Sequence, residues 1–218
     1  MLSTLRKPSP TRAASVAIAL SAIVIACCSQ ANANQFANPS FEDPITYDGP
    51  PFVGSWEGFS GGAAGTSTLV STVMPRTGAS HIDLTLGGPN SFAGVFQDVP
   101  VTGGSTWSFM GWHKAVGSNT NVGPEVRIEW RDDTSEIGRT PNLVPALTSD
   151  YTMFNLVATA PAGATIARAV YAGQTFSTGG SGTLFIDDFS FKVPEPGSVL
   201  LAGIGLIGVV RFARRRRA

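Results

Sequence analysis

Residues 95–115 read VFQDVPVTGGSTWSFMGWHKA, and this stretch decides the fold class of the chain. Two runs rich in β-branched and aromatic residues flank Gly103-Gly104, a pair that is typical of a turn. Side chains alternate between the two faces of a strand, so Trp107 and Trp112, five positions apart, point to opposite faces. The stretch therefore predicts two strands joined by a turn.

The rest of the middle segment shows similar alternation and little helical periodicity. Turns rich in Gly and Pro separate its short apolar runs, and residues 174–182 are expected to form an exposed loop. We expect strands at residues 81–86, 94–101, 105–114, 125–130, 151–160, 166–173 and 183–191. Strands at this spacing predict an all-β domain over residues 34–192, an antiparallel β-sandwich of the jelly-roll type.

The first 33 residues predict an export signal. A basic start is followed by the apolar run AASVAIALSAIVIACC at residues 13–28 and by Ala31 and Ala33 in an A-x-A arrangement. This order is typical of a secretory signal peptide, which we expect to be cut after Ala33. Two alternatives stay open, an uncleaved membrane anchor and a lipoprotein signal at Cys27. Cleavage after Ala33 would leave the mature protein without cysteines, and hence without disulfides.

The last 26 residues read VPEPGSVLLAGIGLIGVVRFARRRRA. As a helix, the uncharged run from 197 to 210 would reach about 21 Å at about 1.5 Å per residue, whereas a bilayer core is about 30 Å thick. The run is therefore short for a permanent anchor, and the basic cluster behind it would stay on the cytoplasmic side. That cluster comprises Arg211, Arg214, Arg215, Arg216 and Arg217.

The tail at residues 193–218 resembles the PEP-CTERM sorting signal of Gram-negative bacteria. The resemblance rests on Val193, Pro194, Glu195 and Pro196, followed by the apolar run and the basic cluster. It implies an exosortase as partner, a membrane protease that removes the tail and passes the protein to the cell surface or extracellular matrix. It also implies exopolysaccharide production and a transient stay in the inner membrane through a C-terminal helix. A plain C-terminal anchor is the alternative.

The formal net charge of zero hides an uneven distribution of 15 basic and 15 acidic residues. Three basic residues lie in the first 12 positions and five in the last eight. Residues 34–193 are left with seven basic and fourteen acidic side chains. An acidic domain of this kind argues against nucleic acid as a partner, because phosphate binding needs a basic surface.

Several phrases of the middle segment resemble galactose-binding-like sandwiches, a group that includes carbohydrate-binding modules. NPSFEDP at residues 38–44 resembles their opening motif, and Trp56 stands where a Trp follows that motif. Residues 95–115 resemble one of their strand pairs, while 160–173 and 184–191 resemble their last strands. The resemblance implies a jelly roll and, less directly, sugar binding, because the fold hosts many functions.

The same resemblance implies a structural calcium ion. In related modules the Glu of the opening motif and an Asp of a closing Asp-Asp pair hold Ca²⁺, which points here to Glu42 and Asp187. Oxygen ligands suit Ca²⁺, and an ion bound by the folded chain would stabilise a domain without disulfides. The sequence does not identify the remaining ligands, and ordinary surface acids are the alternative.

Sugar binding in a sandwich needs aromatic rings and polar side chains on one sheet face. The alternation in EVRIEW at residues 125–130 directs every second side chain outward, and Trp112 points away from Trp107. We expect a sugar-binding face formed by Trp56, Gln97, Trp112, Arg127 and Glu129. In the alternative, the two tryptophans cover the edge of the core.

No catalytic arrangement stands out in the sequence. Glu125 and Glu129 share a strand face, but four residues of strand span about 13 Å, wider than the ~5–9.5 Å between glycosidase carboxyl groups. His81 and His113 stand in no catalytic motif, and we expect His113 at the surface. The sequence predicts a non-enzymatic, surface- or matrix-sorted protein that binds or scaffolds extracellular polysaccharide. The alternatives are a structural or adhesive matrix protein without sugar binding, and a secreted glycan hydrolase.

Overall fold

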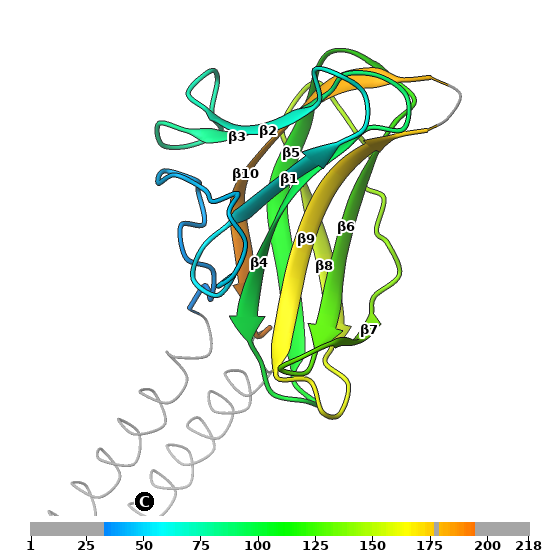
Figure 1. Cartoon of the computed structure of the whole chain (residues 1–218). Coiled ribbons are helices and arrows are strands. Elements are labelled where there is room, and N and C mark those ends of the chain that lie inside the picture. The colour runs from blue at the N-terminus through cyan, green and yellow to red at the C-terminus, as the bar shows by residue number, and fades with distance from the viewer. Residues whose placement is uncertain (1–32, 177–178, 195–218) are drawn as a thin grey trace, which may run out of the picture. The chain divides into compact units, whose positions relative to one another are not determined.

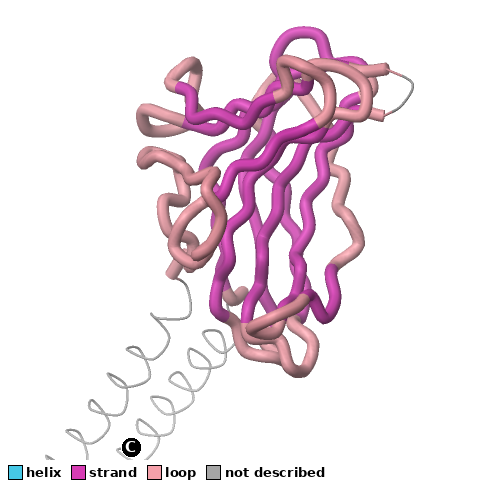
Figure 2. The backbone as a smooth tube through the Cα atoms, viewed as in Figure 1, coloured by secondary structure: helices cyan, strands magenta, loops and turns pink. Residues whose placement is uncertain are grey.

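The computed structural model describes residues 33–176 and 179–194, and the regular elements in these ranges are β-strands (Figures 1 and 2). Residues Asn34–Val193 form one compact unit. No helix in the described ranges is long and apolar enough to cross a membrane. The expected signal peptide and C-terminal helix lie almost wholly outside these ranges. The strands are β1 (Glu57–Gly61), β2 (Ser67–Ser71), β3 (His81–Leu86), β4 (Phe92–Pro100), β5 (Thr106–Thr120), β6 (Val122–Arg131), β7 (Glu136–Arg139), β8 (Thr152–Thr159), β9 (Ile166–Thr175) and β10 (Ser181–Lys192).

The strands form two antiparallel sheets of five strands each, packed as a sandwich (Figure 1). Sheet A has the order β1-β4-β9-β6-β7, and sheet B has the order β2-β3-β10-β5-β8. The all-β sandwich predicted from the turn spacing is confirmed. The turn at Gly103-Gly104 joins β4 in sheet A to β5 in sheet B, so the two strands of the 95–115 stretch belong to opposite layers.

Each of the seven strands expected from the sequence corresponds to a strand of the structure. β1, β2 and β7 were not expected, because they are only four or five residues long and carry few large apolar side chains. The loop expected at 174–182 is shorter than predicted, since β9 runs to Thr175 and β10 begins at Ser181.

The core lies between the inner faces of the two sheets. On β6 the alternation buries Val126, Ile128 and Trp130, as the sequence predicts, and the charged residues between them face outward. In sheet B the rings of Phe109, Phe154 and Phe189 meet edge to face at centroid distances of 5.3–5.5 Å. Each such pair contributes about 0.5–1.5 kcal/mol beyond its buried area. Aromatic packing therefore supplies much of the cohesion of a domain whose described residues include no cysteine.

The described chain enters the sandwich beside β10. The Asn34 side chain donates to the Phe189 carbonyl at 2.9 Å and accepts from the Phe191 amide at 2.9 Å. The Gln35 amide donates to the Phe191 carbonyl at 2.9 Å. These bonds place the first residues after the expected cleavage point directly against the last strand.

Both histidines are buried, so the expectation of a surface His113 is wrong. His113 points into the core from the same face of β5 as Trp107. Its Nδ1 lies 2.7 Å from the Tyr171 hydroxyl of sheet A. His81 packs on the Phe185 ring at 4.2 Å, and neither of its ring nitrogens has a hydrogen-bond partner within the described residues. Burial is the main reason that the pKa of each imidazole is lowered to about 4, and for His81 the nearby Lys114 contributes to the lowering.

Acid should destabilise the domain through these two groups. Because folding lowers the pKa of His81 from 6.5 to about 4, the unfolded chain binds this proton more tightly. The free energy of unfolding should therefore fall as the pH drops from about 6.5 toward 4. We expect His81→Leu to reduce this loss, measured as urea midpoints at pH 7 and pH 5. An unchanged difference between the two midpoints would show that His81 is not buried as a neutral ring.

Candidate functional site

The outer face of sheet A carries an aromatic half and a charged half. Cross-strand register fixes which residues share this face. Phe96, Val170 and Arg127 form one row across β4, β9 and β6, and neighbouring rows follow at every second residue. Phenylalanines line the β1 and β4 side of the face, whereas arginines and glutamates line the β6 and β7 side.

Phenylalanine rings lie over glycines on this face. The pairs are Phe92 over Gly61, Phe59 over Gly94 and Phe176 over Gly123. A Cβ on Gly61 would lie 2.5 Å from Cζ of Phe92, so this ring leans across the neighbouring strand into space that only glycine leaves free. Phe92 nevertheless remains 47% exposed. The face thus presents aromatic surface to solvent in positions that the backbone fixes.

The charged half of the face is built around Arg127. Its guanidinium pairs with Glu125 and, at 2.8 Å, with Glu129 on the same strand. The Gln174 side chain donates to Glu125 at 3.2 Å, and Arg139 of β7 lies 4.0 Å from Glu129. Most of these groups are only slightly exposed, so the network holds its donors and acceptors in fixed positions.

Arg168 joins the two halves of the face. Its guanidinium forms two hydrogen bonds to Asp98, at 2.7 and 2.9 Å, in the paired geometry that holds an arginine most firmly. The same guanidinium lies over Phe96 at 4.2 Å and over Phe52 at 4.8 Å. The aromatic and the charged groups therefore form one continuous surface across β4, β9 and β6.

Such a surface can bind a ligand with apolar ring faces and many hydroxyl groups. Exposed rings stack on apolar faces, while fixed carboxylate, guanidinium and amide groups exchange hydrogen bonds with hydroxyls. Sequence reasoning found Arg127 and Glu129 from strand alternation but missed the phenylalanines. The signal for Phe92 and Phe59 is a Phe directly opposite a Gly, which becomes visible only when the strand register is known.

The other residues expected on this face lie elsewhere, so the expectation of one shared five-residue face is wrong. Trp56 is in the core, where its ring contacts Phe36, and its Nε1 donates to the Asn38 carbonyl at 3.0 Å. Gln97 is buried, and its amide binds the main chain of Ala37 at 2.8 and 3.1 Å. Polar and aromatic residue types alone did not reveal these inward directions.

Trp112 lies on the outer face of sheet B, away from Arg127 and Glu129. Its direction opposite to Trp107 agrees with the alternation, since Trp107 is buried and stacks on Phe191 at 4.9 Å. The Arg76 guanidinium covers the Trp112 ring at 3.8 Å. This contact occupies one face of the ring, which leaves Trp112 less suited to stacking on a ligand than Phe92.

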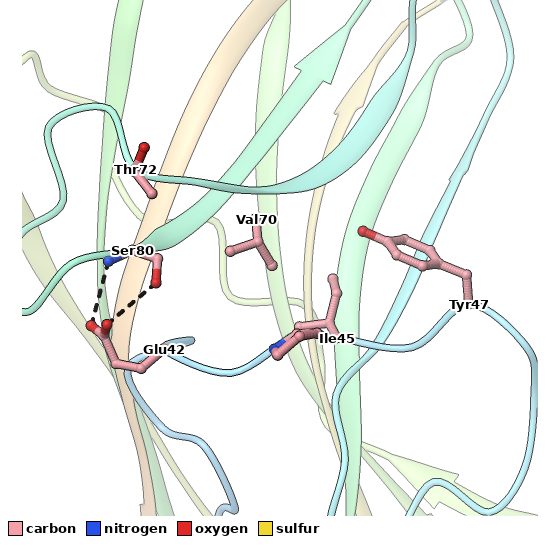
Figure 3. Close-up of a pocket in the computed structure, with 7 residues that line it drawn as sticks. Glu42, Ile45, Tyr47, Val70, Thr72 and Ser80 are labelled. Carbon is pink, nitrogen blue, oxygen red and sulfur yellow. Dashed lines mark hydrogen bonds between the residues drawn. The ribbon is translucent and has the colours of Figure 1, made fainter.

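A pocket of about 430 Å³ opens between the segment 42–47 and β2 (Figure 3). Figure 3 shows Glu42 and Tyr47 toward opposite ends of this pocket, with Ile45 and Val70 between them. Pro44, Thr72 and Ser80 complete its lining. The pocket and the outer face of sheet A share no lining residue.

Glu42 and Asp187, the residues expected to hold calcium, both bind the loop that joins β2 to β3. Asp187 is fully buried and accepts the Arg76 and Thr77 amides at 2.9 and 3.2 Å. The Glu42 carboxylate accepts the Ala79 amide at 3.0 and 3.1 Å. The structure therefore brings the opening segment and the last strand to one loop, as the resemblance implies.

The calcium site implied by the resemblance stays a prediction, and the bonds of these carboxylates point to a structural role as the alternative. The oxygens of both carboxylates accept N–H groups, and no group of three or more Asp, Glu, His or Cys that could hold a metal occurs in the described ranges. Burial raises the pKa of Asp187 to about 6. The nearby positive charge belongs to Arg76, which pairs with Asp188.

Of the sorting motif, Val193 packs against the core and Pro194 ends the described range. Glu195, Pro196 and the arginine cluster lie outside the described residues. Residues 192–217 match the family described as the PEP-CTERM protein-sorting motif. This motif indicates export and sorting through an exosortase in Gram-negative bacteria. A search of curated protein sequences finds no match.

Solved structures share the sandwich fold. The xylan-binding domain CBM22-1 of Xyn10C from Paenibacillus barcinonensis is 15% identical, with a TM-score of 0.51 over 72% of this chain and 92% of that chain. The carbohydrate-binding module TmCBM61, solved in complex with β-1,4-galactotriose, is 14% identical, with a TM-score of 0.50 over 74% of this chain and 99% of that chain. The domain thus has the jelly-roll fold of carbohydrate-binding modules.

An enzyme also contains this fold. The enzymatically active domain of tailspike protein 4 from bacteriophage CBA120 is 15% identical, with a TM-score of 0.56 over 74% of this chain. This chain spans only 21% of that tailspike chain. The fold accordingly occurs both in binding modules and within an enzyme.

Removal of calcium should leave the stability of the protein unchanged. Main-chain N–H donors hold the Glu42 and Asp187 carboxylates in place without an ion, so neither EDTA nor added CaCl₂ should shift the thermal midpoint of the full chain. Asp187→Asn should lower the midpoint. The two carboxylate oxygens of Asp187 together accept three main-chain N–H groups, whereas an asparagine side chain has only one oxygen that can accept them. A thermal midpoint that rises by several degrees when calcium is added, with no such rise in Asp187→Asn, would support the calcium hypothesis.

Proposed function

We propose that this is an exported carbohydrate-binding protein that holds glycan chains on the outer face of sheet A. The observation that carries the proposal is the exposed Phe92 ring on the same face as the Arg127 network. A pyranose offers apolar C–H faces to such a ring and hydroxyls to such a network. The structural neighbours that bind xylan and β-1,4-galactotriose support this choice of ligand class.

The proposed place of action rests on the sorting signals expected in the N-terminal and C-terminal segments. The N-terminal segment would direct export and be removed after Ala33, and an exosortase would process the tail after a transient stay in the inner membrane. The mature domain would then act at the cell surface or in the matrix, binding or scaffolding exopolysaccharide. The PEP-CTERM motif supports this route.

Two other functions remain candidates. A structural or adhesive matrix protein would use the same surface for protein contacts and would retain no glycan. A hydrolase would need a free acid and a free base, but Glu125, Glu129 and Asp98 on this face are each paired with an arginine. The paired carboxylates favour binding over hydrolysis.

Native affinity gels containing xylan or β-1,4-galactan test the proposal. We expect at least one soluble polysaccharide to retard the full-length protein in mild detergent. Phe92→Ala should weaken the apparent affinity measured from the retardation about tenfold, because the stacking ring is lost. Arg127→Met should weaken binding as well, since Glu125 and Glu129 would lose their shared partner.

Met153→Ala is the matched control. Met153 is 55% exposed on the outer face of sheet B, so its loss removes a similar exposed apolar side chain from the other layer. It should leave retardation unchanged. The proposal fails if a broad set of plant and bacterial polysaccharides gives no retardation, or if Phe92→Ala and Met153→Ala behave alike.

A further inference from the structure

We infer that the pocket in Figure 3 is a second sugar site, which takes one pyranose unit that is neutral or carries an amino group and excludes acidic sugars. This inference goes beyond glycan binding on sheet A, because the two surfaces share no lining residue. Each binding site can therefore be disproved without disproving the other. A domain with both sites can bridge two glycan chains.

Tyr47 forms a fixed aromatic wall at one end of the pocket. Its hydroxyl donates to the Thr68 carbonyl at 2.6 Å, and one edge of its ring lies where a Cβ of residue 58 would be, so Gly58 permits the contact. Tyr47 is nevertheless 54% exposed. A ring held at two points and open to solvent can stack on a sugar with little loss of side-chain entropy.

The middle of the pocket is apolar. Ile45 is almost fully buried, Val70 of β2 is partly exposed, and Pro44 continues the same surface (Figure 3). A volume of about 430 Å³ falls within the range of small-molecule pockets, about 300–1,000 Å³. The space suits a single ring with one apolar face rather than a long chain.

Polar groups stand at the Glu42 end. The Glu42 carboxylate is held by the Ala79 amide and by the Ser80 hydroxyl at 3.3 Å, which fixes its orientation. Glu42 is exposed and pairs with no cation within the described residues, so its remaining lone pairs can accept hydroxyl or ammonium protons. The Thr72 hydroxyl lines the same pocket.

The charge around the pocket selects the ligand. Glu42 lies at one end of the pocket. Glu57 does not line the pocket but lies near Tyr47 at the other end, where it accepts the Thr46 hydroxyl at 2.8 Å and the Gly49 amide at 3.0 Å. Burial raises the pKa of Tyr47, and the nearby Glu57 carboxylate adds to this increase. A uronate carboxylate would meet like charge from both sides, whereas an ammonium group would be attracted.

Saturation-transfer NMR on the full-length protein in detergent micelles tests the site. The probes are the methyl glycosides of glucose, galactose, glucosamine and glucuronic acid. We expect transfer to at least one neutral or amino glycoside and at least tenfold less to the glucuronide. Tyr47→Ala should remove this transfer, while Met153→Ala, which removes a similarly exposed apolar side chain from the outer face of sheet B, should leave it unchanged.

Val70→Trp gives an independent variant that fills the pocket without removing Tyr47. It should also abolish transfer while leaving polysaccharide retardation in affinity gels intact. The inference is overturned if no glycoside shows transfer, if glucuronide binds as well as glucoside, or if transfer survives in a folded Tyr47→Ala or Val70→Trp protein. Loss of transfer in Phe92→Ala alone would assign the monosaccharide to sheet A instead.

Discussion

The buried carboxylate of Asp187 is the interaction on which the arrangement of the whole end of the sandwich depends. It sits on β10 at the point where the register with β5 shifts, and it accepts main-chain amides from the loop between β2 and β3. Its neighbour Asp188 accepts the hydroxyls of Ser40 and Thr77. One bulge in the last strand thereby joins the opening segment, the β2–β3 loop and sheet B, which are far apart in sequence.

This junction also positions a carboxylate of the pocket, one of the two candidate surfaces. The loop held by Asp187 continues to Ala79 and Ser80, which orient Glu42 at the rim of the pocket. On sheet A the same result is reached differently, because arginine–carboxylate pairs fix one another directly. In both places polar groups are positioned before any ligand arrives, so binding loses little free energy in ordering them.

The sequence predicted the layers of the fold better than the location of its site. Period-two alternation on β6 correctly directed Arg127 and Glu129 outward, because burial of Val126 and Ile128 leaves no other choice. Trp56 and Gln97 were misplaced, since an aromatic or amide side chain is equally compatible with a core position once a partner such as Asn38 or Ala37 is near. The Phe92–Gly61 contact depends on cross-strand register, which separate strand patterns do not specify.

The position of β10 has a mechanical consequence. β10 is the central strand of sheet B, antiparallel to β3 on one side and to β5 on the other, and the sorting motif follows it directly. A protein tethered through that end would transmit tension along the axis of β10. The ladder hydrogen bonds lie across this axis, so they would be loaded together in shear rather than opened one after another. Force applied through the C-terminal end of the domain would thus be resisted by the central strand of sheet B.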